Sequence, residues 1–392
     1  MKKIFILFFA FTQLLFAAGT SLVVDAEIED FLKDITKPIL KSANIDFESV
    51  NFYIVDDNSI NAFVSGGQNI FVNTGTLTAF NTPDALLGIL AHEIGHIAGG
   101  HIANFGNSIK KAQGISIGGI LLGVGALIAG APDVAQFLLL GGVGAAQQQI
   151  LHYSRTQEET ADSLGTQYLQ ANGMSAQALL ISMNTFYKQE LDLPNNTEYF
   201  ITHPLSRNRK ERLEQKIKAE KGVSDAPFND KYQRRFDFIK AKILGYKMKD
   251  LSGLKGDYLI YAKAISNNSL DNANYLSKKE PKNPYFYELK ADILLKKRQP
   301  KEALENYFIV DNLLKSNVLI KKTIAFIVAK YEQKEYYKKA ISLLKYVELV
   351  DSKDYSILKL LAELYYLDGD KGKSTEYFNE YNTTKKEMEE RR

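Results

Sequence analysis

The most constraining feature of this chain is the pentapeptide His92-Glu93-Ile94-Gly95-His96. Histidines four residues apart lie on one face of an α-helix, so both imidazoles can bind the same Zn²⁺. Glu93, beside the first histidine, can take a proton from the attacking water and later deliver it to a leaving amine. The chain has only five histidines, which makes a chance match rare. We therefore expect a helix from Ala85 to about Ala98 that carries a zinc site with Glu93 as its catalytic base.

A catalytic zinc needs a third protein ligand and one open position. His101 is close in sequence, but on a continued helix it would face away from His92, which favours a structural or supporting role over ligation. Farther on, Glu158 and Asp162 are four residues apart on a helix predicted to begin near Tyr153. Glu158 could be the third ligand, and Asp162 could orient a zinc-binding histidine. By spacing alone, however, such a pair is more often a solvated helix face.

Residues 1–19 have the pattern of an export signal peptide. Lys2 and Lys3 precede the mostly apolar run Ile4–Phe16, and small residues follow up to a cleavage position after Gly19. An uncleaved N-terminal anchor is the alternative, although the run is short for a membrane-spanning helix. The sequence contains no cysteine, which excludes disulfides, thiolate metal sites and a lipid-modified N-terminal cysteine. We expect an exported protein, most simply in the periplasm of a double-membraned bacterium.

The segment 20–220 has the pattern of an α+β, zincin-like metallopeptidase domain that is mostly helical. An amphipathic helix is expected over Asp25–Ala43. Three short stretches rich in β-branched and aromatic residues then predict a small antiparallel sheet. They are Val50–Val55, Ala62–Val64 and Gln68–Val72.

Between the two expected metal-binding helices, residues 112–151 are apolar and rich in glycine, and Asp133 is their only charged residue. Glycines in G-x-x-x-G spacing permit close helix packing, so this segment predicts a helical hairpin. The hairpin could pack on the domain or on a partner subunit, or it could contact or enter a membrane. Its high glycine content makes each half a weak spanning helix.

Taken together, these motifs resemble the zinc endopeptidase family that includes the CaaX prenyl endopeptidase and the HtpX heat-shock protease. The resemblance rests on the His92–His96 helix, the Ser154–Asp162 segment and Asn61-Ala62-Phe63 before a glycine-containing turn. It is greatest to a periplasmic branch with a C-terminal helical repeat. It implies that Glu158 is the third ligand of one zinc per chain and that Asp162 supports the site. It also implies that Asn61, Ala62, Phe63 and Val64 form an edge strand that pairs with the substrate backbone.

The segment Thr202–Arg209 contains a His-Pro pair, which taken alone indicates only a surface turn. The family resemblance implies more. His203 would lie on a loop over the active site and reach the zinc as a fourth, regulatory ligand. Arg209 would face the catalytic centre and stabilise the oxyanion that forms when water attacks the peptide carbonyl.

Helical periodicity runs through the C-terminal part of the chain. Residues 221–230 have the composition of a linker, and residues 231–392 show a loose tetratricopeptide-like period. Ala303, Ala340 and Ser374 recur near the expected spacing of about 34 residues. We therefore expect an all-α, tetratricopeptide-like solenoid whose concave surface can hold a partner or an extended chain.

Two functions remain open at this stage. The complete set of metal ligands and base favours a zinc endopeptidase over a periplasmic chaperone or scaffold that acts mainly through its repeats. The resemblance implies quality control in the bacterial envelope, with cleavage of misfolded or stalled outer-membrane proteins. The repeats would dock substrate or the barrel assembly machinery, and residues 112–151 could contact a membrane surface. The formal net charge of +3 argues against a nucleic-acid partner, and the export signal argues against an intramembrane prenyl-protein peptidase.

Overall fold

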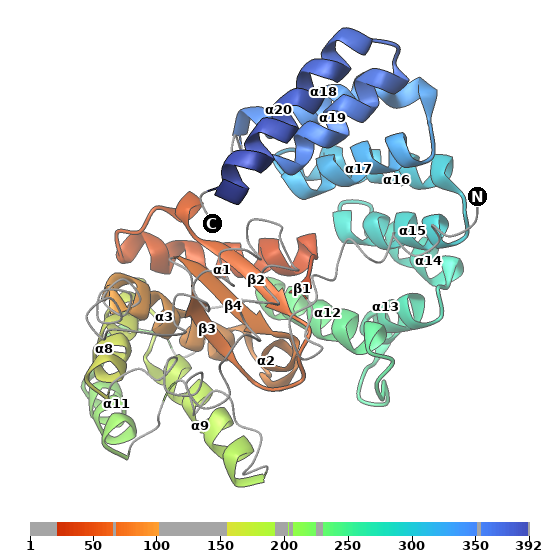
Figure 1. Ribbon diagram of the computed structural model, residues 1–392. Helices are drawn as coiled ribbons and strands as arrows, with labels where there is room; N and C mark the ends of the chain where they lie inside the picture. Colours follow the sequence, from red (N-terminus) through yellow and green to blue (C-terminus); the bar gives the residue numbers. More distant parts are fainter. Residues whose placement is uncertain are drawn as a thin grey trace. The chain divides into compact units, whose positions relative to one another are not determined.

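Helices dominate the computed structural model of this chain, and one small sheet lies near the N-terminus (Figure 1). The structure describes residues 22–65, 68–101, 155–192, 203, 207–224, 230–350 and 354–390. The predicted signal peptide (1–19) and the predicted hairpin (112–151) lie outside these residues. The chain divides into two compact units, residues 1–240 and 241–392, which we describe separately.

The sheet of the first unit is mixed, so the prediction of an antiparallel sheet is wrong in part. Its strands are β1 (Leu22–Val23), β2 (Asn51–Val55), β3 (Ala62–Ser65) and β4 (Asn69–Asn73), in the order β1-β2-β4-β3. β3 and β4 are antiparallel, but β2 and β4 run parallel. Every residue of β4 is buried, and this strand takes a central place, whereas β3 lies at the edge. Strand periodicity predicts the strands but not which of them become neighbours.

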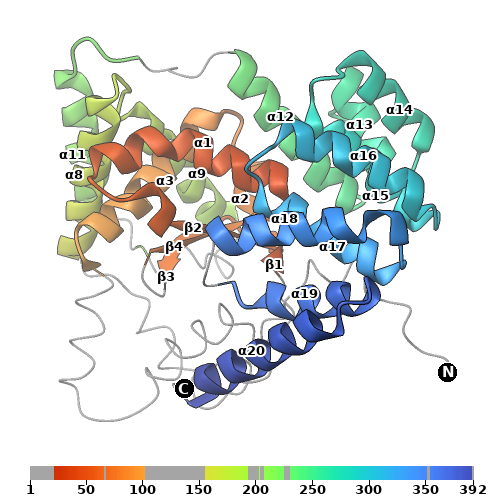
Figure 2. The same ribbon diagram turned by 90° about the horizontal axis from the view of Figure 1, so that it is seen from above.

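Two helices, α1 (Ala26–Ser42) and α3 (Pro83–Ala98), cover one face of the sheet (Figure 2). The side chain of Asp25 accepts a hydrogen bond from the backbone N–H of Ile28 at 3.1 Å, which caps α1. The Thr82 side chain caps α3 in the same way at Ala85. The predicted helices at these positions are thereby confirmed to within a few residues. α2 (Thr74–Ala79) joins β4 to this layer.

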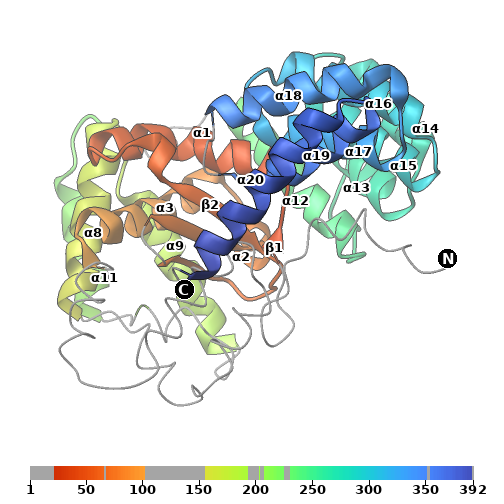
Figure 3. The same cartoon turned by 45° about the horizontal axis from the view of Figure 1, so that its top comes forward.

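Helix α3 packs between α8 (Arg155–Ala171) and α9 (Gln177–Asp192), and α11 (Arg207–Ala219) contacts both of the latter (Figure 3). Glycines let these backbones approach closely. A Cβ on Gly95 would lie 2.6 Å from the carbonyl oxygen of Ala161, and one on Gly165 would lie 2.9 Å from that of Ala91. Since larger residues would push α3 and α8 apart, these glycines bring the two predicted metal-binding helices into direct contact.

The second unit consists of helices, each of which packs against the next along the chain. Ala303 and Ala340 are fully buried between helices, as expected for small residues of a helical repeat. The tetratricopeptide-like assignment itself stays a prediction. Helix α12 (Asp230–Tyr246) crosses the boundary between the units, and the helices that follow are α13 (Gly256–Ser266), α14 (Leu270–Lys279), α15 (Pro284–Lys296), α16 (Pro300–Leu313), α17 (Val318–Lys330), α18 (Tyr337–Val350), α19 (Ser356–Leu367) and α20 (Lys371–Glu390).

Within the described ranges, none of the helices combines the length and the apolar character that crossing a bilayer requires.

Candidate metal centre

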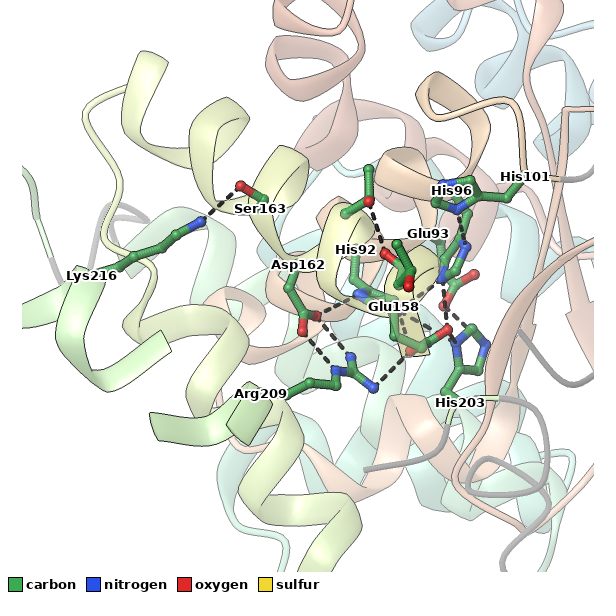
Figure 4. Close-up of polar contacts among 12 residues, drawn as sticks. His92, Glu93, His96, His101, Glu158, Asp162, Ser163, His203, Arg209 and Lys216 are labelled. Atoms are coloured by element: carbon green, nitrogen blue, oxygen red, sulfur yellow. Dashed lines mark hydrogen bonds and ion pairs between the residues drawn. The ribbon is translucent and has the colours of Figure 1, made fainter. Parts of the chain in front are cut away.

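Four buried side chains from three parts of the chain meet at one point (Figure 4). α3 contributes His92 and His96, α8 contributes Glu158, and His203 comes from the segment between α9 and α11. One potential ligand atom from each residue lies within 4.8 Å of those from the other three. All four side chains are fully shielded from solvent. The structure therefore brings together the three predicted zinc ligands and the predicted regulatory histidine.

Five separations between donor atoms of these residues are close to those found in zinc sites. The Nε2 atoms of His92 and His96 are 3.1 Å apart, and they lie 3.4 Å and 3.2 Å from the Glu158 carboxylate oxygens. Nδ1 of His203 is 3.3 Å from His92 Nε2 and 3.1 Å from Glu158 Oε1. Zinc bonds of about 2.0–2.1 Å in tetrahedral geometry place ligand atoms about 3.3 Å apart. The donors of His92, His96 and Glu158 therefore fit Zn²⁺ in chemistry and spacing, and a third imidazole, that of His203, lies beside them.

The outer nitrogen of His92 is held by Asp162. Its Nδ1 lies 2.9 Å from Asp162 Oδ1, which leaves Nε2 directed at the metal position. Arg209 fixes Asp162 in turn: its Nε lies 2.7 Å from Oδ2, and its Nη2 lies 2.8 Å from Oδ1. The third guanidinium nitrogen of Arg209, Nη1, lies 2.7 Å from Glu158 Oε2. Arg209 thus connects Glu158 and Asp162 of α8, a role that its sequence position alone did not indicate.

His96 is oriented by a different partner, His101. Helix α3 ends at Ala98, and Gly100 takes a left-handed backbone conformation with φ of 63°. This turn brings His101 back toward the helix, so that its Nδ1 lies 2.8 Å from Nδ1 of His96. His101 thus contacts a predicted ligand from outside the group of four. Its place depends on a turn that an extrapolated helix does not contain.

Glu93, the predicted catalytic base, is fully buried beside the four side chains. Its Oε1 lies 3.6 Å from Nε2 of His203. Burial raises the pKa of Glu93 above its usual value, while the neighbouring histidines and the backbone of Val64 in β3 oppose that rise. A carboxyl group with a raised pKa is suited to accept a proton and to return it. The contact with Val64 also places the predicted edge strand next to the base.

In this centre the carboxylates stabilise positive charge on His92, and the histidines stabilise negative charge on Glu158. Burial alone would lower the pKa of His92, but hydrogen bonds to Asp162 and Glu158 outweigh it and raise the pKa to about 10. Although burial would raise it, the pKa of Glu158 is held well below its usual range, first by His203 and then by hydrogen bonds to His92 and His96. The carboxylates of Glu158 and Asp162 therefore favour a positive charge at the point where the histidines meet. A bound zinc would supply that charge, and its binding requires neutral histidines.

Comparisons with known proteins place this centre in a family. The model of peptidase family M48 matches residues 27–217, which include every residue of the candidate centre. The beta-barrel assembly-enhancing protease of Yersinia pestis is 25% identical over 242 residues, covering 62% of this chain and 49% of the relative. Its counterpart from Escherichia coli (strain K12) is 24% identical over 196 residues, covering 48% of this chain and 38% of the relative. Metalloprotease LoiP of Escherichia coli (strain K12) is 25% identical over 179 residues, covering 45% of this chain and 66% of the relative.

The chain spans about half, or less, of the length of the first two relatives. The family predicted from the sequence is nevertheless confirmed, and metallopeptidases of this family depend on zinc. Residues 27–217, which hold the four converging side chains, thus belong to peptidase family M48.

Proposed function

We propose that this protein is a zinc endopeptidase of the bacterial periplasm that cleaves unfolded or misassembled envelope proteins. The observation that carries the proposal is the spacing of 3.1–3.4 Å among donor atoms of His92, His96, Glu158 and His203, with Glu93 buried beside them. The names of the first relatives refer to the assembly of β-barrels. They support outer-membrane proteins as the substrate class and barrel assembly machinery as a partner.

In this proposal, His92, His96 and Glu158 would hold a zinc ion, which would supply Lewis-acid chemistry toward the scissile carbonyl and the attacking water. Glu93 takes the proton from that water and passes it to the nitrogen of the leaving amine. Asp162 keeps the His92 ring in the tautomer that presents Nε2. Arg209 lies 2.7 Å from Glu158, where its positive charge can also stabilise the developing oxyanion.

His203 acts as a latch in this scheme. A zinc with three protein ligands needs its fourth position for water and substrate. His203 Nδ1 lies 3.3 Å from His92 Nε2 and 3.1 Å from Glu158 Oε1, which supports this imidazole as a fourth ligand of a bound metal. The enzyme is then latent, and it becomes active when His203 moves away. Latency would protect productive folding intermediates in the envelope from cleavage.

The remaining parts of the chain serve substrate capture. Strand β3 (Ala62–Ser65), preceded by Asn61, would pair with an extended substrate at the edge of the sheet. The helical unit 241–392 would dock substrate or the assembly machinery. The export signal predicted for residues 1–19 supports a periplasmic location.

The decisive comparison is between the wild type and Glu93→Gln, with casein as an unfolded substrate. The amide is nearly isosteric but cannot accept the proton, so cleavage should cease while zinc content stays at one per chain. If the variant keeps activity within about tenfold of the wild type, Glu93 is not the base. If neither protein cleaves casein but both suppress aggregation of an unfolded protein, the chain is better described as a chaperone.

A further inference from the structure

Three aromatic side chains form a ladder across the sheet of the first unit. Tyr53 of β2, Phe71 of β4 and Phe63 of β3 are direct cross-strand partners. Their rings stack, with centroids 5.1 Å apart between Tyr53 and Phe71 and 5.0 Å apart between Phe71 and Phe63. The ladder belongs to a cluster completed by Leu22 and Val55, and all five residues come from strands.

The ladder lies on the face of the sheet opposite the helices. Side chains alternate between the two faces of a strand, and Ile70 and Val72, on either side of Phe71, are fully buried on the helix side. Phe71 is only 3% exposed, whereas Phe63 is partly exposed at the edge. The ladder therefore ends in an aromatic ring at the edge where β3 has no further neighbour among the described strands.

The main chain of β3 shows which of its groups face this edge. Asn61 accepts a hydrogen bond from the backbone N–H of Asn73 at 3.0 Å, so its carbonyl points toward β4. Because these directions alternate along an antiparallel strand, the main-chain groups of Ala62 and Val64 point toward the edge. The Val64 backbone contacts Glu93 there, so the edge beside Phe63 adjoins the proposed base.

We propose that Phe63 selects an aromatic or large apolar side chain at one fixed position of the substrate. The inference rests on the proposed pairing of substrate with β3. A strand added at this edge would place one side chain on the ladder face directly beside Phe63, about 5 Å away. The residues on the same face to either side of Phe63, Asn61 before the strand and Ser65 at its end, are polar and buried. The ladder thus offers one aromatic subsite along the edge, and strands of outer-membrane barrels, which expose aromatic side chains, would suit it.

The size of this preference follows from known cross-strand pairs. An aromatic pair across two strands is favoured enough over a small polar partner to change kcat/KM by about three- to tenfold. Such an effect directs where an unfolded chain is cut without restricting which chains are cut.

The test uses peptides of one length and cleavage site, in which a single Phe is moved through successive positions of an otherwise serine-rich sequence. For the wild type we expect kcat/KM to peak about three- to tenfold at one position. Phe63→Val keeps a strand-favouring residue and should flatten the peak while still cleaving the Phe-free peptide. Phe63→Leu should lower the peak only partly. Tyr53→Val, at the far end of the ladder, is the matched control and should keep the peak.

Four outcomes would overturn the inference. An unchanged peak in Phe63→Val would show that Phe63 does not select the side chain. An equal loss of cleavage for all peptides in both Phe63 variants would show that this residue only supports the strand. Cleavage by the wild type without any peak overturns this inference alone, whereas no cleavage of any peptide overturns the proposed function and this inference with it.

Discussion

At the scale of single residues, the two histidines of α3 depend on different supports. Asp162, itself bound by Arg209, contacts Nδ1 of His92. The imidazole of His101 contacts Nδ1 of His96 instead. When both Nε2 atoms bind metal, both Nδ1 atoms carry protons and donate to these partners. The His96–His101 contact was only partly predictable, because it needs the turn at Gly100.

His101 should therefore tune zinc affinity without being a ligand. Replacing His92, His96 or Glu158 with Ala should abolish zinc retention, because three ligands are the minimum. His101→Ala should retain zinc on purification but bind it about 10- to 100-fold more weakly, as expected on loss of a partner that orients a ligand. A competition titration with a zinc chelator measures this difference. Complete loss of zinc from His101→Ala, equal to that from Glu158→Ala, would contradict the ligand assignment.

His203 and Arg209 should have opposite effects on turnover. His203→Ala removes the proposed fourth ligand, so basal cleavage of unfolded casein should rise while zinc remains bound. Arg209→Ala removes the guanidinium group that holds both Asp162 and Glu158, and turnover should fall about 10- to 100-fold, as expected on loss of a partner that orients metal ligands. Initial rates normalised to bound zinc measure both effects. A fall in His203→Ala as severe as that in Arg209→Ala would refute the latch.

At the scale of elements, the site depends on how closely α3 and α8 pack. The two histidines and the base could be proposed from sequence because their spacing follows from helix geometry, whereas Glu158 was expected from the family resemblance. The mixed strand order of the sheet could not be predicted, because the alternation of apolar and polar residues within a strand does not show which strand becomes its neighbour. The glycines at 95 and 165 were also missed as packing residues. Their small size is the only sequence signal, and it has meaning only once the opposing backbone is known.

Gly95→Ala tests this packing. The added methyl group would lie 2.6 Å from the carbonyl oxygen of Ala161, so α8 must shift and carry Glu158 away from the histidines. We expect a loss of about 1–3 kcal/mol in the free energy of unfolding, together with weaker zinc binding. Denaturant unfolding monitored by circular dichroism measures the first effect. Gly253→Ala, with no atom within 4 Å of the added group, is the control and should change stability by less than about 0.5 kcal/mol. Equal stability of the two variants would contradict the packing argument.

At the scale of the whole molecule, a family M48 domain is followed by a helical unit that the family model does not cover. The helices of this second unit followed from sequence periodicity. The binding partner of this unit could not be predicted, because it depends on exposed side chains rather than on the buried pattern that forms the helices. Its repeat class stays a prediction. The division of labour proposed here predicts that cleavage depends on the metal centre of the first unit.

Zinc titration of the metal-free protein tests that central claim most directly. The full chain is stripped with a chelator, and casein cleavage is followed as zinc is added back. We expect no cleavage without metal, and a rise in rate that saturates at one zinc per chain. The same titration of Glu93→Gln should bind one zinc and yield no cleavage. Cleavage that persists in the stripped protein, or that is unchanged when zinc is restored, would contradict the account.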